Sequence, residues 1–136
     1  MAEFADIRAG IAANLRAYFP DAQVTGYRLA NPTPPAFEVF LTEVEYDEAM
    51  ARGHDVYRIT VRGFVPAAVD IGAQKNLDVM SKSAGASSVK AALESDRTFG
   101  GSVLDSLVVS RGEEQIYGEG SYYGADWFLE AQAAGT

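Results

Sequence analysis

Cysteine is absent from the 136-residue sequence, and histidine occurs only once, as His54. Without cysteine the chain has no disulfide framework, zinc thiolate site or cysteine nucleophile. A Ser-His-Asp triad would have to be built around His54, yet the Gly-x-Ser-x-Gly turn that presents the nucleophile in many hydrolases does not occur. We therefore interpret His54 as a polar residue at the edge of a loop, and we predict no catalytic residues.

Long apolar runs are also missing. No segment approaches the ~18 consecutive apolar residues of a membrane span. Residues 1–8 carry acids where an export signal has a basic start followed by an apolar run. We expect a protein that is made in the cytoplasm and has no membrane partner.

Positive charge is scarce. Lys and Arg number 11 against 19 Asp and Glu, which gives a formal net charge of -8. The basic residues are scattered from Arg8 to Arg111, whereas a nucleic-acid-binding protein gathers them on one face to displace counterions. We expect no specific binding of DNA, and an acidic surface would repel DNA that passes close to it.

The remaining composition is ordinary for a globular protein. Hydrophobic residues make up 48% and charged residues 22% of the chain, so disorder is not expected. No internal repeat or linker divides the sequence, and we expect residues 1–136 to form a single domain.

The periodicity of the apolar residues predicts helices at the start and in the middle of the chain. Ile7, Ile11 and Leu15 recur at helical spacing, and Pro20 ends that pattern. Helices are expected over residues 4–18, 69–80 and 87–94, and strands over residues 23–29, 37–46 and 55–65, with several more within 103–131. This order lacks strand-helix alternation, so we predict an α+β fold: a single antiparallel or mixed sheet with helices packed on one face, plus an extended loop or hairpin arm around residues 43–52.

Two strands carry apolar residues on both faces. In the segment 37–46, Phe37 and Val39 alternate with polar residues, but Phe40 then makes the other face apolar, which indicates either a bulge or a covered face. Near the C-terminus, Trp127 and Phe128 are adjacent, so one of them must point away from the helices. An outward apolar face favours contact with a neighbouring subunit.

Two further patterns resemble ligand sites only superficially. The carboxylates of residues 43, 45, 47, 48 and 55 lack the loop spacing of a calcium site, so we interpret them as a solvated acidic segment. The glycines at 118, 120 and 124 do not match the spacing of a dinucleotide-binding turn, and strand follows them where a helix is required. We predict no metal site and no cofactor.

One segment resembles a known family. Ala86 to Gly101, followed by Val103 and Asp105, is similar to the second half of the tail terminator proteins of long-tailed, siphovirus-like bacteriophages. In that family a short helix of the form Ser-Val-x-x-Ala-Leu precedes an acidic residue and a Thr-Leu-Gly-Gly turn that starts the C-terminal strands. Here Phe99 replaces the leucine. The order of elements is also similar over most of the chain.

The resemblance implies a tail-terminator-like structural subunit of the virion and not an enzyme. Such subunits form a ring, sixfold in the family, that caps the tail tube and joins it to the head-tail connector or stopper protein. The location implied is the tail or neck of the virion, and DNA passes through the ring without specific binding. A negative lumen is consistent with that passage.

Ring contacts are head-to-tail, so each subunit needs two complementary surfaces. We predict that the acidic arm, the first residues of the strand after it and the turn after the short helix supply them. The predicted interface residues are Tyr46, Asp47, Glu48, Met50, Arg52, His54 and Phe99.

Two alternatives remain open at this point. The chain could be another head-tail connector protein, or a minor tail or tube protein of the same kind of particle. From a different class, a small α+β enzyme or ligand-binding domain could place its site among Asp55, Arg58, Arg62 and the C-terminal tyrosines. A deep pocket with converging polar groups would favour the second alternative, and a flat apolar strip on the sheet would favour assembly.

Overall fold

The computed structural model describes residues 4–27, 35–46, 54–66, 70–85, 87–101, 103–113, 115–117 and 122–134. Within them the chain forms three helices and six strands. The helices are α1 (Phe4–Tyr18), α2 (Asp70–Met80) and α3 (Val89–Leu93). The strands are β1 (Gln23–Val24), β2 (Ala36–Glu45), β3 (His54–Pro66), β4 (Asp105–Arg111), β5 (Gln115–Tyr117) and β6 (Tyr122–Ala134).

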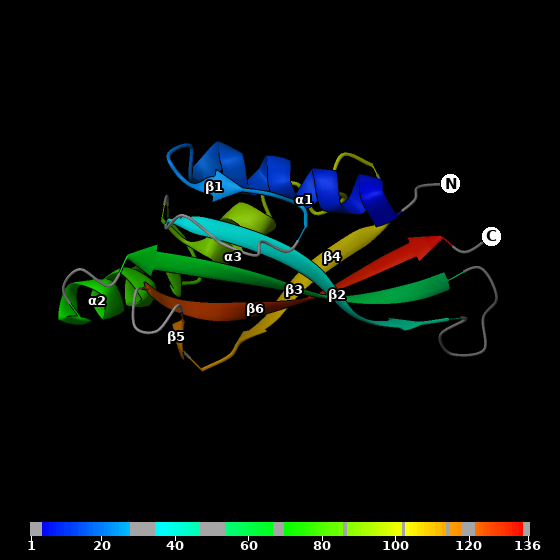
Figure 1. Cartoon of the computed structure of the whole chain (residues 1–136). Coiled ribbons are helices and arrows are strands. Elements are labelled where there is room, and N and C mark those ends of the chain that lie inside the picture. Colours follow the sequence, from blue (N-terminus) through cyan, green and yellow to red (C-terminus); the bar gives the residue numbers. More distant parts are fainter. Residues whose placement is uncertain are drawn as a thin grey trace.

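The strands form one mixed sheet in the order β1-β2-β3-β6-β4, and β5 pairs with the beginning of β6 (Figure 1). Only the short β1–β2 pairing is parallel, and the pairings of β2, β3, β6 and β4 are antiparallel. The predicted α+β class with a single mixed sheet is confirmed. The centre of the sheet is the long β3–β6 pair, which joins residues far apart in the sequence.

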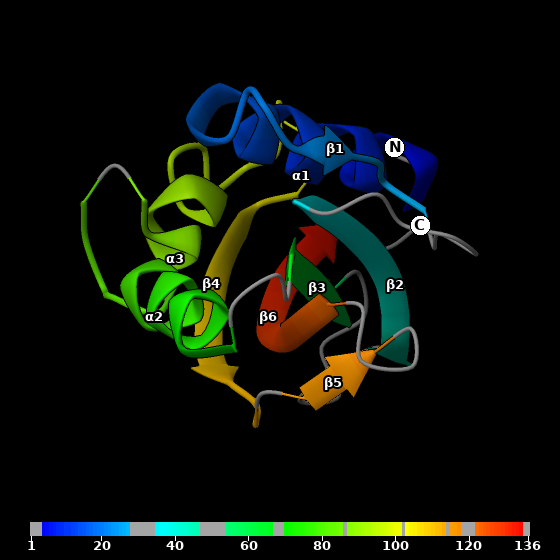
Figure 2. The ribbon, with the colours of Figure 1, turned by 60° about the vertical axis from the view of Figure 1, so that its left-hand side comes forward.

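The helices cover one face of this sheet. Figure 2 shows the sheet as a curved layer with α1 and α3 along one side of it, and Figure 1 shows α2 at the end of the sheet where β3 finishes. The helices contribute Ile7, Ile11, Leu15, Leu77 and Leu93 to the core, each at most 1% exposed. Their spacing in α1 is the helical stripe that predicted the helix.

The sheet contributes alternate residues to this core. Val61 of β3 lies between Val39 of β2 and Trp127 of β6 in the strand register, and all three side chains are buried. The opposite face is not covered in the same way: Trp127 is 2% exposed, but the next residue, Phe128, is 38% exposed. This confirms that one of the two aromatic side chains points away from the helices.

The structure bears on three further expectations. The register of β2 against β3 shifts between Leu41 and Glu43, so a bulge places Val44 opposite Tyr57; Phe40 precedes the bulge and lies on the other face, under the guanidinium of Arg62. Glu43 and Glu45, at the start of the predicted arm, lie inside β2 and pair with β3, and residues 47–53 lie outside the described residues. The first predicted strand, 23–29, is a strand only at Gln23–Val24, and Thr25 to Tyr27 are not part of one.

Candidate assembly surface

The face of the sheet away from the helices carries two rows of charged residues across its strands. In the first row, Arg58 of β3 forms ion pairs with Glu43 at 3.4 Å and Glu45 at 2.8 Å on one side, and with Glu130 of β6 at 3.3 Å on the other. The hydrogen bond to Glu45 raises the pKa of the Arg58 guanidinium further above its usual value. The row is partly exposed, so its members remain available to a partner.

The second row crosses the same three strands four residues further along β3. Arg62 of β3 donates to both carboxylate oxygens of Asp126, at 2.7 and 3.2 Å, and lies 3.6 Å from the carboxylate of Glu38. The three residues are direct cross-strand neighbours. Arg62 also lies over the ring of Phe40, 5.1 Å from its centroid. Glu38 is only 3% exposed, so this row is the more buried of the two.

Apolar side chains lie between and beside the two rows. Phe128 of β6 is 38% exposed, and Leu107 and Val109 of β4 are 48% and 55% exposed. Beside Phe128, the hydroxyls of Thr42 and Thr60 are 2.6 Å apart. A shallow hollow of about 230 Å³ opens here. Its lining residues are Thr42, Arg58, Ile59, Val109, Phe128, Leu129 and Glu130.

We call this surface the open face and define it by three exposed apolar residues, Leu107, Val109 and Phe128, and three half-buried charged residues, Arg58, Glu130 and Asp126. Apolar residues flanked by charges are typical of protein interfaces, in which aromatic and arginine side chains are enriched. The open face has that composition. It places exposed apolar side chains on the uncovered side of the sheet, although charged rows and a shallow hollow interrupt them.

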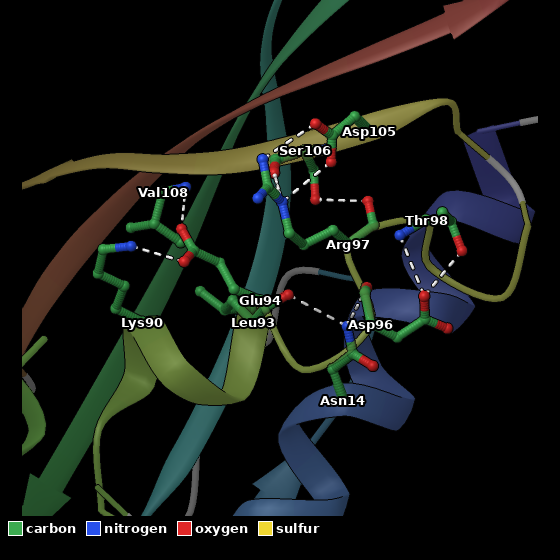
Figure 3. Close-up of polar contacts among 10 residues, drawn as sticks. All are labelled: Asn14, Lys90, Leu93, Glu94, Asp96, Arg97, Thr98, Asp105, Ser106 and Val108. Carbon is green, nitrogen blue, oxygen red and sulfur yellow. Dashed lines mark hydrogen bonds and ion pairs between the residues drawn. The ribbon is translucent and has the colours of Figure 1, made fainter. Parts of the chain in front are cut away.

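The edge of the sheet, in contrast, is blocked at β4. The Nε–H of Arg97 donates to the carbonyl of Ser106 at 2.9 Å, and the backbone N–H of Val108 donates to the carboxylate of Glu94 at 3.0 Å (Figure 3). Side chains after α3 thus occupy backbone groups that would otherwise pair with another strand. A partner cannot add a strand at these two positions of β4 without displacing these side chains.

Glu94 is held in its charged form. Burial alone would raise the pKa of this carboxyl, but hydrogen bonds from Lys90 and from the Val108 N–H, together with the charges of Lys90 and Arg97, lower the pKa below its ordinary value. The Lys90 Nζ lies 2.6 Å from the carboxylate. The edge contact is therefore charge-assisted.

The segment that carries the family resemblance forms α3 and the turn into β4. Ser88 is the N-cap of α3 and accepts a hydrogen bond from the Ala91 N–H at 3.1 Å. In the turn, Asp96 accepts hydrogen bonds from the hydroxyl and N–H of Thr98 and from the N–H of Gly100, which lower the pKa of its carboxyl. Asn14 of α1 donates to the carbonyls of Leu93 and Asp96 and ties this corner to the first helix.

The predicted interface residues lie in different environments. Tyr46 follows β2 and is 72% exposed, and His54 is the first residue of β3, opposite Ala134. Phe99 has a positive φ of 49° and is 1% exposed, packed against Gly10 of α1. Its side chain therefore belongs to the core of this subunit, and we leave it out of the surface proposed below. Asp47, Glu48, Met50 and Arg52 lie outside the described residues.

The alternative ligand site does not converge in the part of the chain that the structure describes. Arg58 and Arg62 lie on the open face, but Asp55 pairs with the buried Ala133 and shares its side of the sheet with Tyr57. Burial and the nearby Asp55 raise the pKa of the Tyr57 hydroxyl. No group of three or more His, Asp or Glu residues suited to a metal ion occurs among the described residues. No described helix is both long enough and apolar enough to cross a membrane.

Sequence reasoning missed most of the open face. Glu130, Asp126, Leu107 and Val109 were not singled out, because each looks like an ordinary strand residue until the register places it beside Arg58, Arg62 or Phe128. The signals that pointed here were the adjacency of Trp127 and Phe128, the apolar Phe40 on the second face of its strand, and Arg58 and Arg62, which were named for a different role.

Comparisons with known proteins find similar proteins among the solved structures. No family model matches the chain, and no curated protein matches it. Among solved structures, a chain in the virion of a native gene transfer agent particle is similar, with a TM-score of 0.49 and 14% sequence identity. The alignment covers 98% of this chain and 92% of that chain. We base no functional assignment on a similarity of this size.

Proposed function

We propose that this chain is a structural subunit of a virion and forms a ring that caps the tail tube and joins it to the head-tail connector. DNA passes through the centre of this ring without specific binding. The observation that carries the proposal is the open face, where apolar residues lie exposed between charged rows on a sheet whose other face is covered by helices. A ring subunit needs such a surface, because it buries part of itself against its neighbours.

The resembling segment supports the choice among assembly roles. Its short helix, which is capped by Ser88, and the glycine turn after it lead directly into β4, one of the strands of the open face. The positive φ values of Gly100 and Gly101, 75° and 89°, explain why this turn uses glycines. The family pattern at this position thus coincides with a structural requirement of the fold.

Charge is consistent with the passage of DNA. The formal net charge of each subunit is -8, so a ring of such subunits is acidic overall. A wall of this sign does not retain a polyanion.

The position of the protein in a particle tests the proposal. Antibody labelling or cryo-electron microscopy of purified virions should place the protein at the junction between the tail tube and the connector. Label along the tube or on the head side of the connector would support the alternative of a tube or other neck protein. Absence from purified particles would contradict a structural virion role altogether.

A further inference from the structure

Helix α2 carries an exposed apolar residue between two lysines. Val79 is 42% exposed; Lys75, one helical turn before it in α2, and Lys82, two residues after the helix ends, are exposed as well. Within the described residues neither lysine has an ion pair, whereas the remaining lysine, Lys90, is held by Glu94 at 2.6 Å. Asp78 is the one acidic side chain of α2 exposed beside them. We call Lys75, Val79 and Lys82 the lysine stripe.

The open face has the complementary pattern on β6. Asp126, Phe128 and Glu130 alternate on one side of this strand, so an acid lies on either side of an exposed aromatic ring. Four residues of strand separate the two acids by about 13 Å. Lys75 lies four residues before Val79, about 6 Å along the helix axis, and Lys82 lies two residues beyond Met80, the last residue of α2. Because lysine side chains are long and flexible, both lysines can reach the acids while Val79 lies over the ring.

The two surfaces lie on different parts of the subunit. α2 packs against β3 and β6 at the end of the sheet where β3 finishes (Figure 1), while Glu130 and its partners lie toward the other end of β6. A contact between the lysine stripe and the open face therefore joins two copies head-to-tail. Such a contact closes into a ring when the rotation between subunits permits it.

We propose that the lysine stripe of one copy docks on the open face of the next, with Val79 over the hollow beside Phe128 and Val109. The partner that docks on the open face is a second copy of this chain, because the chain itself carries both complementary surfaces, the lysine stripe and the acids of the open face. This inference rests on the proposed function, which requires a head-to-tail contact, and it names the surfaces that make it. The ion pairs of Arg58 and Arg62 hold the acids of the open face in place for the incoming lysines.

The absence of cysteine makes a direct cross-linking test possible. The double variant Val79→Cys/Phe128→Cys, treated with a short bismaleimide, should give a ladder of covalent multimers that ends at the size of the ring. Each single variant should stay a monomer on a denaturing gel, because a head-to-tail contact never brings two copies of one position together. The variant Asp21→Cys/Phe128→Cys, with one cysteine in the exposed turn after α1, is the matched control and should also stay monomeric. Thermal unfolding checks that every variant is folded.

Charge reversal provides an independent readout. Lys75→Glu/Lys82→Glu and Glu130→Lys should each weaken self-association at least tenfold, which corresponds to about 1.4 kcal/mol. An equimolar mixture of the two folded variants should recover association, since each then offers the other a complementary surface. Sedimentation velocity measures both effects.

Four outcomes would overturn this contact. Cross-linking of the single variant Val79→Cys would show a two-fold contact. If the double variant Val79→Cys/Phe128→Cys forms rings of normal stability but gives no cross-links, the interface is a different one and the proposed function remains intact. If charge reversal of the lysine stripe abolishes attachment to tail tubes but leaves rings unchanged, the occupant is the tube protein. A wild-type protein that neither associates nor occurs in virions would remove the contact and the proposed function together.

Discussion

Glu94, the residue after helix α3, accepts a hydrogen bond from the backbone N–H of Val108 in strand β4 at a distance of 3.0 Å. The contact occupies an outward-facing donor of the edge strand and ties the short helix to the sheet (Figure 3). It also makes the edge of the sheet sensitive to the charge of one carboxylate.

Loss of that charge should destabilise the protein in a pH-dependent manner. We expect Glu94→Gln to lower the free energy of unfolding by about 1 kcal/mol at neutral pH, because the pair with Lys90 is partly exposed and solvent screens it. The pKa of Glu94 is lowered in the folded state. The Glu94 charge therefore contributes to the free energy of unfolding at pH values above the carboxyl's pKa in the unfolded state, and this contribution is lost as the pH falls through its pKa in the folded state. Urea unfolding at neutral pH and at about pH 3 measures the difference.

The matched control for this variant is Glu113→Gln, an exposed carboxylate at the end of β4. It should change stability little at either pH. A difference between wild type and Glu94→Gln that stays constant on acidification would contradict the role of the charge.

Truncation of Trp127 should mainly lower the stability of the fold, whereas truncation of the adjacent Phe128 should mainly weaken self-association. Trp127→Ala removes a side chain that is 2% exposed, and we expect a loss of about 3–5 kcal/mol in the free energy of unfolding. Phe128→Ala should cost less than about 1 kcal/mol, because its ring is partly exposed on the open face. The second variant should instead weaken self-association, which sedimentation velocity measures. Equal losses of stability would place both rings in the core.

The two charged rows should differ in their contribution to stability. Arg62→Met leaves the buried Glu38 and Asp126 without their guanidinium, and we expect a loss of about 2 kcal/mol at neutral pH. The same substitution at Arg58, whose partners are exposed, should cost at most about 1 kcal/mol. Urea unfolding of both variants makes the comparison directly. A larger loss of unfolding free energy in Arg58→Met than in Arg62→Met would contradict this ranking of the two rows.

The close approach of α1 to the turn after α3 should make Gly10 intolerant of a side chain. A Cβ at this position would lie 2.5 Å from the Cβ of Phe99 and closer still to its carbonyl oxygen. We expect Gly10→Ala to destabilise by about 1–3 kcal/mol despite the better helix propensity of alanine. Ala9→Gly, at an exposed neighbouring position, calibrates propensity and should cost about 1 kcal/mol. Stabilisation by Gly10→Ala would mean that helix and turn are further apart.

The sequence predicted the elements of this fold better than it predicted the surface. The helical stripe of Ile7, Ile11 and Leu15 and the alternation within residues 55–65 depend only on local spacing, and both elements form as expected. The charged rows depend on the register between strands far apart in the chain, such as Arg62 opposite Asp126. Register is set by pairing in the folded sheet, which a local pattern does not specify.

Phe99 illustrates the same limit for a single residue. Its place in a glycine turn suggested an exposed side chain near an interface, but the turn folds back on α1 and buries the ring. A contact of this kind needs the packing of two elements that are distant in sequence. The predicted roles of Tyr46 and His54 stay predictions, because they concern contacts with other subunits.

The mass of the purified wild-type protein in solution tests the central claim most directly. Native mass spectrometry over a range of concentrations, with negative-stain electron microscopy of any large species, should reveal closed rings of a single subunit number with a central hole. A protein that remains monomeric at every concentration, and also fails to assemble on isolated tail tubes, would contradict the account.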